Sequence, residues 1–253
     1  FLVSKTLVGE GAFAQCYSLL CVPVKKSHGL SKVLASKEGK VSKEEIKIMK
    51  HLSYEAKKEK LSYFLDVYNS SLNLSLLTPF CQQGDLISFF GPYSGDEYKD
   101  FYNEKLLSFY KQCLKAFLFL HEKGYFHADV KPENILVGDD NTIKLIDFGY
   151  SFKTSEKKHP IGTLAYKAPE TIWEPYTSNA EVYSLAASFY FLLKRGYYFY
   201  AKYDEIFAED KSQEQQQCAF TVFHESLPEE YIKFHRRIRG ITLPFLADEA
   251  FLY

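Results

Sequence analysis

The sequence predicts an α+β fold in which short strands come first and long helices follow. Residues 2–20 alternate imperfectly between apolar and polar side chains around a glycine-rich turn, which is typical of two antiparallel strands. Residues 98–122 instead carry apolar side chains three and four positions apart, the period of an amphipathic helix. We therefore expect a strand-rich first part and a mainly helical remainder.

The composition indicates a globular protein of ordinary charge. Of 253 residues, 46% are hydrophobic and 25% are charged, which allows a sizeable core. The formal net charge of -1 gives no field that would attract nucleic acid or an acidic membrane. Two apolar stretches, residues 106–120 and 182–193, are shorter than the roughly 20 residues of a membrane-spanning helix, and we expect both to be buried helices.

The cysteines and the first residues favour a reducing, cytoplasmic environment. The five cysteines are odd in number and scattered, so neither a disulfide framework nor a zinc site is expected. The chain begins FLVSK, without a basic or long apolar segment, and no signal peptide is predicted. Domains that flank this chain are left open.

The first strand pair encloses the glycine-rich turn at Gly9 and Gly11. Glycine tolerates dihedral angles and close contacts that a Cβ would forbid, so such a turn lets backbone N–H groups approach a polyphosphate. A plain turn without a ligand is the alternative, because glycine-rich hairpins are common.

Four elements are expected between this turn and the long helix. Residues 32–37 look like a strand that ends at Lys37, and residues 44–52 have the apolar spacing of a helix. Residues 63–68 and 72–78 read as two further strands joined by an Asn-Ser-Ser turn.

The second part continues from the long helix, which is expected to end at Gly124 because glycine favours helix termination. A short strand is predicted at residues 125–127. Residues 135–137 and 142–146 are predicted as two strands around a turn of glycine, aspartate and asparagine.

Two short motifs carry the chemistry. The first, HADVKPEN, spans residues 127–134, and the second, DFG, spans residues 147–149. Carboxylate and amide oxygens are the ligands that Mg²⁺ prefers, and a carboxylate beside a hydroxyl can accept its proton. Together the two motifs resemble the catalytic and metal-binding loops of the protein kinases, and the resemblance extends from Val8 to Leu193.

This resemblance implies the two-lobed fold of a single protein kinase domain over residues 1–253. A small antiparallel β-sheet lobe would occupy residues 1–79, and a larger, mainly helical lobe would occupy residues 80–253. The implied reaction is transfer of the γ-phosphoryl group of ATP, with Mg²⁺ as cofactor, to a protein hydroxyl.

The catalytic roles follow from the same resemblance. Asp129 would be the base, Lys131 would contact the transferred phosphate, and Asn134 and Asp147 would bind Mg²⁺. His127 is expected to be a buried packing residue. The residues that would bind the nucleotide are Gly9, Gly11, Lys37, Glu45, Pro79, Cys81, Leu136 and Asp147.

Several of these nucleotide-binding residues have a specific implied role. Lys37 would hold the α- and β-phosphates and pair with Glu45 from the helix that follows. Thr78 would be the gatekeeper, and backbone groups of Pro79 and Cys81 would face adenine.

A later stretch, GTLAYKAPE at residues 162–170, resembles the substrate-binding loop of peptide-directed kinases. Thr163 would bond Asp129 and Lys131, which favours Ser/Thr over Tyr as the acceptor. The resemblance also pairs Glu170 with a later arginine; the candidates are Arg236, Arg237 and Arg239.

Three positions depart from the family pattern. Ala128 stands where most protein kinases have Arg, so no guanidinium there can pair with a phosphorylated activation loop. Ala14 replaces a glycine of the phosphate loop. Glu181 replaces an Asp whose carboxylate would accept hydrogen bonds from the catalytic loop. None of these changes removes a group that the chemistry needs.

Two other functions stay open. One is a nucleotide-binding scaffold, or pseudokinase, with little or no catalysis. The other is a kinase for a small molecule or lipid, which the stretch at residues 162–170 opposes.

Overall fold

The computed structural model describes residues 2–10, 14–22, 32–39, 41–69, 75–93, 95–159, 162–172, 174–193 and 215. The chain divides into two compact units. The first comprises Phe1–Phe89 and Ile135–Gly149, and the second comprises Phe90–Asn134 and Tyr150–Tyr253. The expected helical piece at residues 229–239 lies outside the described residues.

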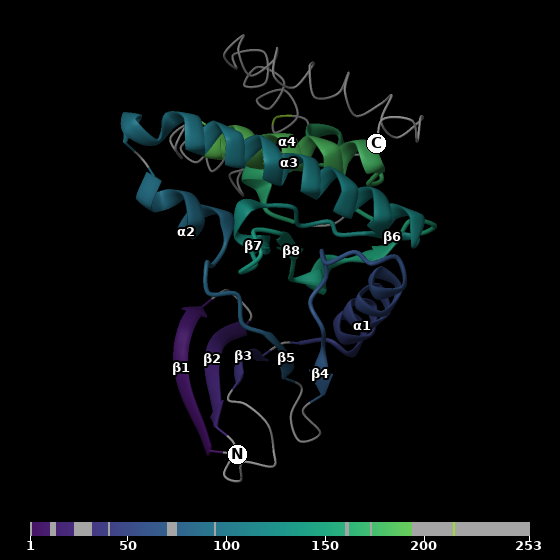
Figure 1. The fold of residues 1–253 in the computed structure, drawn as a ribbon. Helices are drawn as coiled ribbons and strands as arrows, with labels where there is room; N and C mark the ends of the chain where they lie inside the picture. Colours follow the sequence, from purple (N-terminus) through teal and green to yellow (C-terminus); the bar gives the residue numbers. More distant parts are fainter. Residues whose placement is uncertain are drawn as a thin grey trace. The chain divides into compact units, whose positions relative to one another are not determined.

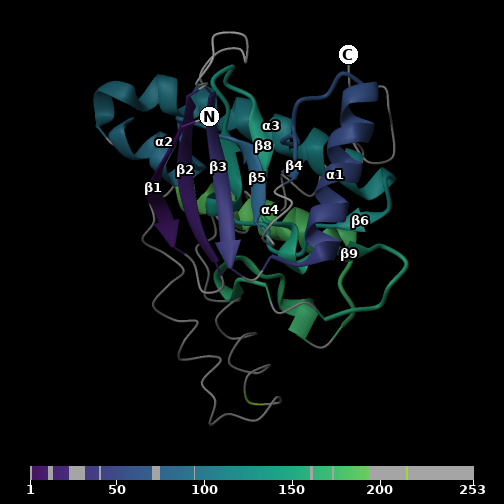
Figure 2. The same ribbon diagram turned by 90° about the horizontal axis from the view of Figure 1, so that it is seen from below.

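The first unit is built on a five-stranded antiparallel sheet in the order β1-β2-β3-β5-β4. Figures 1 and 2 show β1, β2 and β3 side by side. The expected strands at residues 2–20 and 32–37 are confirmed. The strands are β1 (Leu2–Glu10), β2 (Ala14–Val22), β3 (Lys32–Gly39), β4 (Tyr68–Asn69) and β5 (Leu76–Pro79).

Helix α1 (Lys43–Lys58) confirms the helix expected at residues 44–52. It begins directly after Ser42, whose hydroxyl accepts a hydrogen bond from the Glu45 backbone N–H at 2.9 Å. Its apolar stripe is buried through Ile48, Met49 and Leu52. The Ser42 hydrogen bond and the buried apolar residues together fix the orientation of the first turn of α1.

The strand expected at residues 63–68 is largely wrong, because only its last residue, Tyr68, belongs to a strand. Phe64 and Leu65 are adjacent and both buried, whereas a strand with one solvent face would bury alternate residues. The segment instead contacts Leu145, whose N–H donates to the Tyr63 carbonyl at 2.9 Å. The Asn-Ser-Ser turn expected after it includes residues that the structure does not describe.

The predicted strand pair after the catalytic motif is present as β7 (Ile135–Val137) and β8 (Ile143–Leu145). Both strands bury their first and last side chains, while Leu136 is half-buried and forms a bridge with Asp85. This pair belongs to the first compact unit. The compact units therefore interleave along the chain, and the single lobe boundary after residue 79 remains a prediction.

Two long helices organise the second unit, α3 (Lys99–Glu122) and α4 (Ser178–Leu193), which lie side by side in Figure 1. Helix α3 buries one face, whereas α4 is buried over almost its whole length. The expectation that residues 106–120 and 182–193 form buried helices is confirmed. Within the part of the chain that the structure describes, no helix has the length and apolarity needed to cross a membrane.

Helix α3 ends as predicted at Gly124, which has a φ of +79° and donates its N–H to the His121 carbonyl at 2.9 Å. The chain then enters β6 (Tyr125–Phe126), which pairs with β9 (Phe152–Lys153). The rings of Phe126 and Phe152 both meet Tyr176 edge to face. This aromatic cluster joins the start of the catalytic loop to the segment that follows DFG.

Short helices complete the described chain. They are α2 (Leu86–Phe90), η2 (Gly91–Tyr93), η3 (Asp96–Tyr98), η4 (Pro132–Asn134), η5 (Phe148–Tyr150), η6 (Leu164–Tyr166) and η7 (Pro169–Ile172). The four cysteines that the structure describes are all free thiols. Among the described residues, no group of three or more His, Cys, Asp or Glu side chains is placed to hold a metal.

The positive φ at the end of α3 leads to a test of stability. We expect Gly124→Ala to lower the free energy of unfolding by about 1 kcal/mol, because a left-handed backbone strains a residue with a Cβ. Steric room is not the cause, since the nearest atom to an added Cβ, Thr154 Oγ1, lies 3.9 Å away. Urea unfolding measures the change. Gly91→Ala, where an added Cβ meets nothing within 4 Å, is the matched control, and equal stability of the two variants would contradict this account.

Candidate active site

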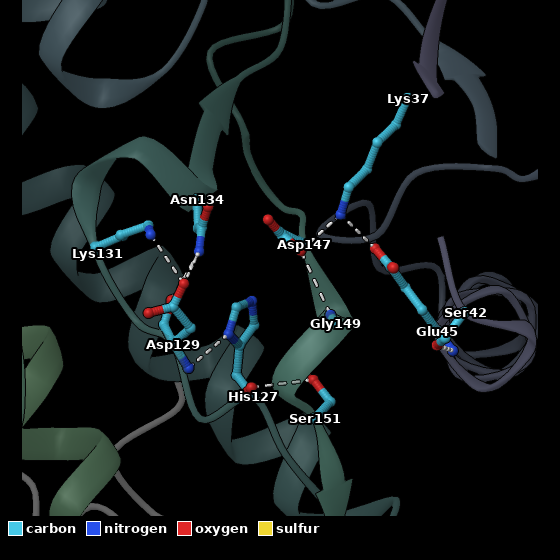
Figure 3. Close-up of polar contacts among 10 residues, drawn as sticks. All are labelled: Lys37, Ser42, Glu45, His127, Asp129, Lys131, Asn134, Asp147, Gly149 and Ser151. Carbon is cyan, nitrogen blue, oxygen red and sulfur yellow. Dashed lines mark hydrogen bonds and ion pairs between the residues drawn. The ribbon is translucent and has the colours of Figure 1, made fainter. Parts of the chain in front are cut away.

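Three charged side chains of the first unit form a cluster, shown in Figure 3, in which Glu45 is buried and Lys37 and Asp147 are half-buried. Lys37 Nζ lies 2.8 Å from Glu45 Oε1 and 2.7 Å from Asp147 Oδ1. The pairing of Lys37 with Glu45 is therefore observed. Glu45 lies only eight positions after Lys37, and the capped start of α1 places it in the first helical turn after β3.

Burial and charge act in opposite directions on this cluster. Burial alone would lower the pKa of Lys37, but the carboxylates of Asp147 and Glu45 outweigh it and hold that pKa above its usual value. Burial raises the pKa of Glu45, and the nearby Lys37 ammonium opposes that effect only in part. The two carboxylates thus fix Lys37 as a cation.

Asp147 is held in an uncommon backbone conformation. Its φ is +61°, and such strain persists only where the surroundings enforce it. The next residue, Phe148, is buried, and its ring packs against Phe64 with centroids 6.2 Å apart. Gly149 donates its N–H to Asp147 Oδ1 at 3.4 Å. The buried Phe148 therefore anchors the residue next to the carboxylate that meets Lys37.

The second unit holds a separate cluster around Asp129, which is buried. Thr163 donates its hydroxyl to Asp129 Oδ1 at 2.7 Å and accepts a hydrogen bond from Lys131 Nζ at 2.9 Å. Lys131 Nζ also lies 2.9 Å from Asp129 Oδ2. The expected contacts of Thr163 with both residues are confirmed. Asp129 is an acceptor with donors on both oxygens, which fixes the direction of its carboxylate.

Asn134 faces the same aspartate. Its amide nitrogen donates to the Asp129 carbonyl at 2.8 Å and to Asp129 Oδ2 at 3.0 Å, as Figure 3 shows in part. With the nitrogen engaged in this way, Oδ1 is the atom of this amide that could bind a cation. A hard oxygen atom in that position suits Mg²⁺.

The loop that carries Asp129 is tied to α4 by Glu181. Glu181 Oε1 accepts hydrogen bonds from the backbone N–H groups of His127 and Ala128, the latter at 2.8 Å. Its other oxygen, Oε2, lies 2.5 Å from His121 Nε2 on α3. The predicted anchoring by the carboxylate at position 181 is observed. The contribution of His121 was missed, because its place in the last turn of α3 does not reveal its partner on α4.

His127 is buried, as expected for a packing residue, with 1% of its surface exposed. Its Nδ1 accepts a hydrogen bond from the Asp129 N–H at 3.3 Å, and its carbonyl accepts one from the Ser151 hydroxyl at 3.1 Å. The following residue, Ala128, has a φ of +67°. The loop therefore turns sharply between its anchor and its carboxylate.

The remaining predicted nucleotide-binding residues that the structure describes lie in the first unit. Gly9 is exposed in β1 beside a register shift, and Thr78 in β5 lies opposite Ala35. Pro79 pairs with Leu34, and Cys81 is buried. Gly11 and the three candidate partners of Glu170, which are Arg236, Arg237 and Arg239, lie outside the described residues.

Comparisons with known proteins agree with this geometry. The protein kinase domain model matches residues 2–239. Serine/threonine-protein kinase TIO of Arabidopsis thaliana is 30% identical over 195 residues, which is 73% of this chain and 14% of that protein. Death-associated protein kinase 2 of Homo sapiens is 32% identical over 167 residues, 63% of this chain and 44% of that protein.

A third relative, maternal embryonic leucine zipper kinase of Danio rerio, is 32% identical over 156 residues, 59% of this chain and 22% of that protein. The chain thus spans less than half the length of each of these relatives. The likeness concerns one domain of longer proteins.

The anchor at Glu181 gives a testable expectation. Glu181→Ala would leave two buried backbone N–H groups without their acceptor, and we expect it to lower the free energy of unfolding by about 3 kcal/mol. Chemical denaturation measures the loss. Glu174→Ala, an exposed glutamate in the preceding loop, is the control. Similar losses for both variants would show that the carboxylate does not hold the loop.

Proposed function

The chain belongs to the protein kinase domain family, and from this premise we propose that it is an active serine/threonine kinase acting on proteins. The observation that carries the proposal is the contact of Lys37 with both Glu45 and Asp147, at 2.8 and 2.7 Å. A protein kinase requires this pairing in order to hold ATP productively.

The residues present fit a complex of ATP with Mg²⁺. ATP supplies the phosphoryl group, and Mg²⁺ offsets its negative charge. Asn134 and Asp147 offer the hard oxygen atoms that would hold the metal. Lys37 would contact the α- and β-phosphates. The other proposed nucleotide-binding residues are Gly9, Gly11, Glu45, Pro79, Cys81 and Leu136.

In the second unit, Asp129 would accept the proton of the acceptor hydroxyl. Its contacts with Thr163 and Asn134 fix its carboxylate before a substrate arrives. Lys131, which contacts both Asp129 and Thr163, supplies a cation for the transferred phosphate. The chain's own residues thus orient the acceptor and move its proton.

The acceptor we propose is a serine or threonine of a protein. The contacts of Thr163 with Asp129 and Lys131 support this choice, as does the similarity to a serine/threonine-protein kinase of Arabidopsis. The loop at residues 162–170 is the feature that opposes a small-molecule or lipid substrate. A cytoplasmic location remains a prediction.

Substitution of the two aspartates tests the proposal. We expect Asp129→Ala to reduce phosphoryl transfer by roughly 100-fold or more while ATP binding persists, because the base acts on the acceptor. Asp147→Ala should weaken Mg²⁺-dependent ATP binding as well. Labelled ATP with one generic acidic and one generic basic protein measures transfer, and a fluorescent nucleotide measures binding. Asp139→Ala, in an exposed turn, is the control.

The outcomes separate the candidate functions. Transfer of labelled phosphate to a protein that depends on both Asp129 and Asp147 would support the kinase function. ATP binding by the unsubstituted chain without label in either protein would contradict the proposal and support a nucleotide-binding scaffold. Loss of ATP binding in Asp129→Ala would contradict the role given to Asp129.

A second prediction concerns activation. Ala128 offers no guanidinium to a phosphate, and the segment after DFG is held by pairing of Phe126 with Phe152 and by hydrogen bonds. The Thr154 N–H donates to the Gly124 carbonyl and the Tyr176 N–H to the Lys158 carbonyl, both at 2.9 Å. We therefore expect full dephosphorylation to leave the transfer rate unchanged, as measured before and after phosphatase treatment. A fall of about tenfold or more would contradict this expectation.

A further inference from the structure

Tyr176 is a buried tyrosine of the second unit to which the proposed reaction gives no role. Its ring packs edge to face against Phe126 and Phe152, with centroids 5.5 and 6.0 Å away. Burial raises the pKa of its hydroxyl well above the usual value, and the carboxylates of Glu181 and Asp129 raise it further. The hydroxyl therefore stays protonated, in the neighbourhood of the proposed base.

The proton of this hydroxyl is directed at Ser184. The side chains of Tyr176 and Ser184 are hydrogen-bonded to each other. Ser184 lies in the buried helix α4 and donates its own proton to the Ala180 carbonyl at 3.0 Å. A hydroxyl has one proton to donate and two lone pairs that accept. Tyr176 is therefore the donor in this pair, and its oxygen keeps the capacity to accept a hydrogen bond.

A small cavity adjoins both this pair and the proposed base. Its lining includes Tyr176, Ser184, Asp129, Gly162 and Thr163. The centres of water-sized spheres can occupy about 10 Å³ of it, which is room for one water molecule and too little for a substrate side chain. A Cβ added to Gly162 would lie 3.9 Å from Asp129 Oδ1. Oδ1 is therefore the carboxylate oxygen on the Gly162 side of the cavity.

Asp129 can accept one more hydrogen bond at this oxygen. A carboxylate oxygen accepts about two hydrogen bonds, and an ionised carboxylate donates none. Among the described residues, Thr163 is the one donor to Oδ1, at 2.7 Å, whereas Oδ2 meets both Asn134 and Lys131. Asp129 Oδ1 and the Tyr176 oxygen are thus two acceptors beside one water-sized space. A water molecule has two protons and can donate one to each.

We propose that this cavity binds one ordered water molecule, which donates to Asp129 Oδ1 and to the Tyr176 oxygen and makes Tyr176 a positioning residue for the base. With Thr163 and the water on Oδ1, the acceptor hydroxyl is directed to Oδ2, which Lys131 leaves when it contacts the transferred phosphate. This role in the reaction rests on the proposed function, whereas the water site does not. Lys167 also lines the cavity, and the alternative is that its ammonium meets the two oxygens instead.

A crystal structure of the unsubstituted chain tests the water site directly. We expect one density peak within about 3 Å of both Asp129 Oδ1 and the Tyr176 oxygen. In crystals of Tyr176→Phe, which keeps the ring and loses only the hydroxyl, the peak should vanish. An empty cavity in the unsubstituted chain, a Lys167 ammonium in place of the water, or a peak that Tyr176→Phe leaves unchanged would overturn the inference.

Kinetics test the positioning role. We expect Tyr176→Phe to lower kcat for transfer to a generic protein about fivefold while KM for ATP stays unchanged, because the base loses one water-mediated hydrogen bond. Tyr102→Phe is the matched control, since it also removes a buried hydroxyl, one that donates to the Leu192 carbonyl at 2.5 Å on the far helix end. It should leave kcat unchanged.

The outcomes distinguish this inference from the proposed function. An equal fall of kcat in both variants, or a fall in neither, would contradict the role of Tyr176 while phosphoryl transfer itself stands. Absence of all transfer by the unsubstituted chain would contradict the proposed function and the positioning role together. The density peak decides the water site in either case.

Discussion

The catalytic loop depends on one buried carboxylate, that of Glu181. It accepts two backbone N–H groups from the loop and meets His121 with its second oxygen. Removing a carboxylate from water costs several kcal/mol unless donors replace the lost hydration, and here three donors converge on it. Helix α4 is buried over almost its whole length, so this carboxylate cannot turn back to solvent. The path of the loop before Asp129 is therefore set by helix packing, and the extra methylene relative to aspartate is accommodated.

In the first unit, too, groups of the protein replace the lost hydration of a charged side chain, but there the charge is positive. There the buried group is a cation, Lys37, and two carboxylates replace its hydration. Glu45 is almost fully buried, whereas Asp147 is 38% exposed. The more exposed carboxylate keeps surface that a further ion could reach, whereas the buried one contacts the lysine out of reach of solvent. This difference in burial between the two acids is visible only in the folded chain.

The sequence predicted the structure closely where the spacing of apolar residues matched the face that is buried in the folded chain. Strands β1, β2, β3 and β7 and helices α1, α3 and α4 follow from the local pattern of apolar and polar residues and, at the end of α3, from Gly124. The segment at residues 63–68 failed because Phe64 and Leu65 are both buried against other parts of the first unit, and a short apolar run does not show which partner buries it. His121 was overlooked because a lone histidine at a helix end carries no signal until its partner is known.

The sequence by itself determined the type and spacing of the reactive groups: a carboxylate, a lysine and an amide within HADVKPEN, and a second carboxylate in DFG. Those properties are local, and neighbouring residues fix them. The tertiary structure alone decided which groups meet. Glu181 reaches a loop more than 50 residues away, and Lys37 reaches Asp147 across 110 residues. Such pairs depend on how helices and strands pack, and packing is a property of the whole folded chain rather than of any stretch within it.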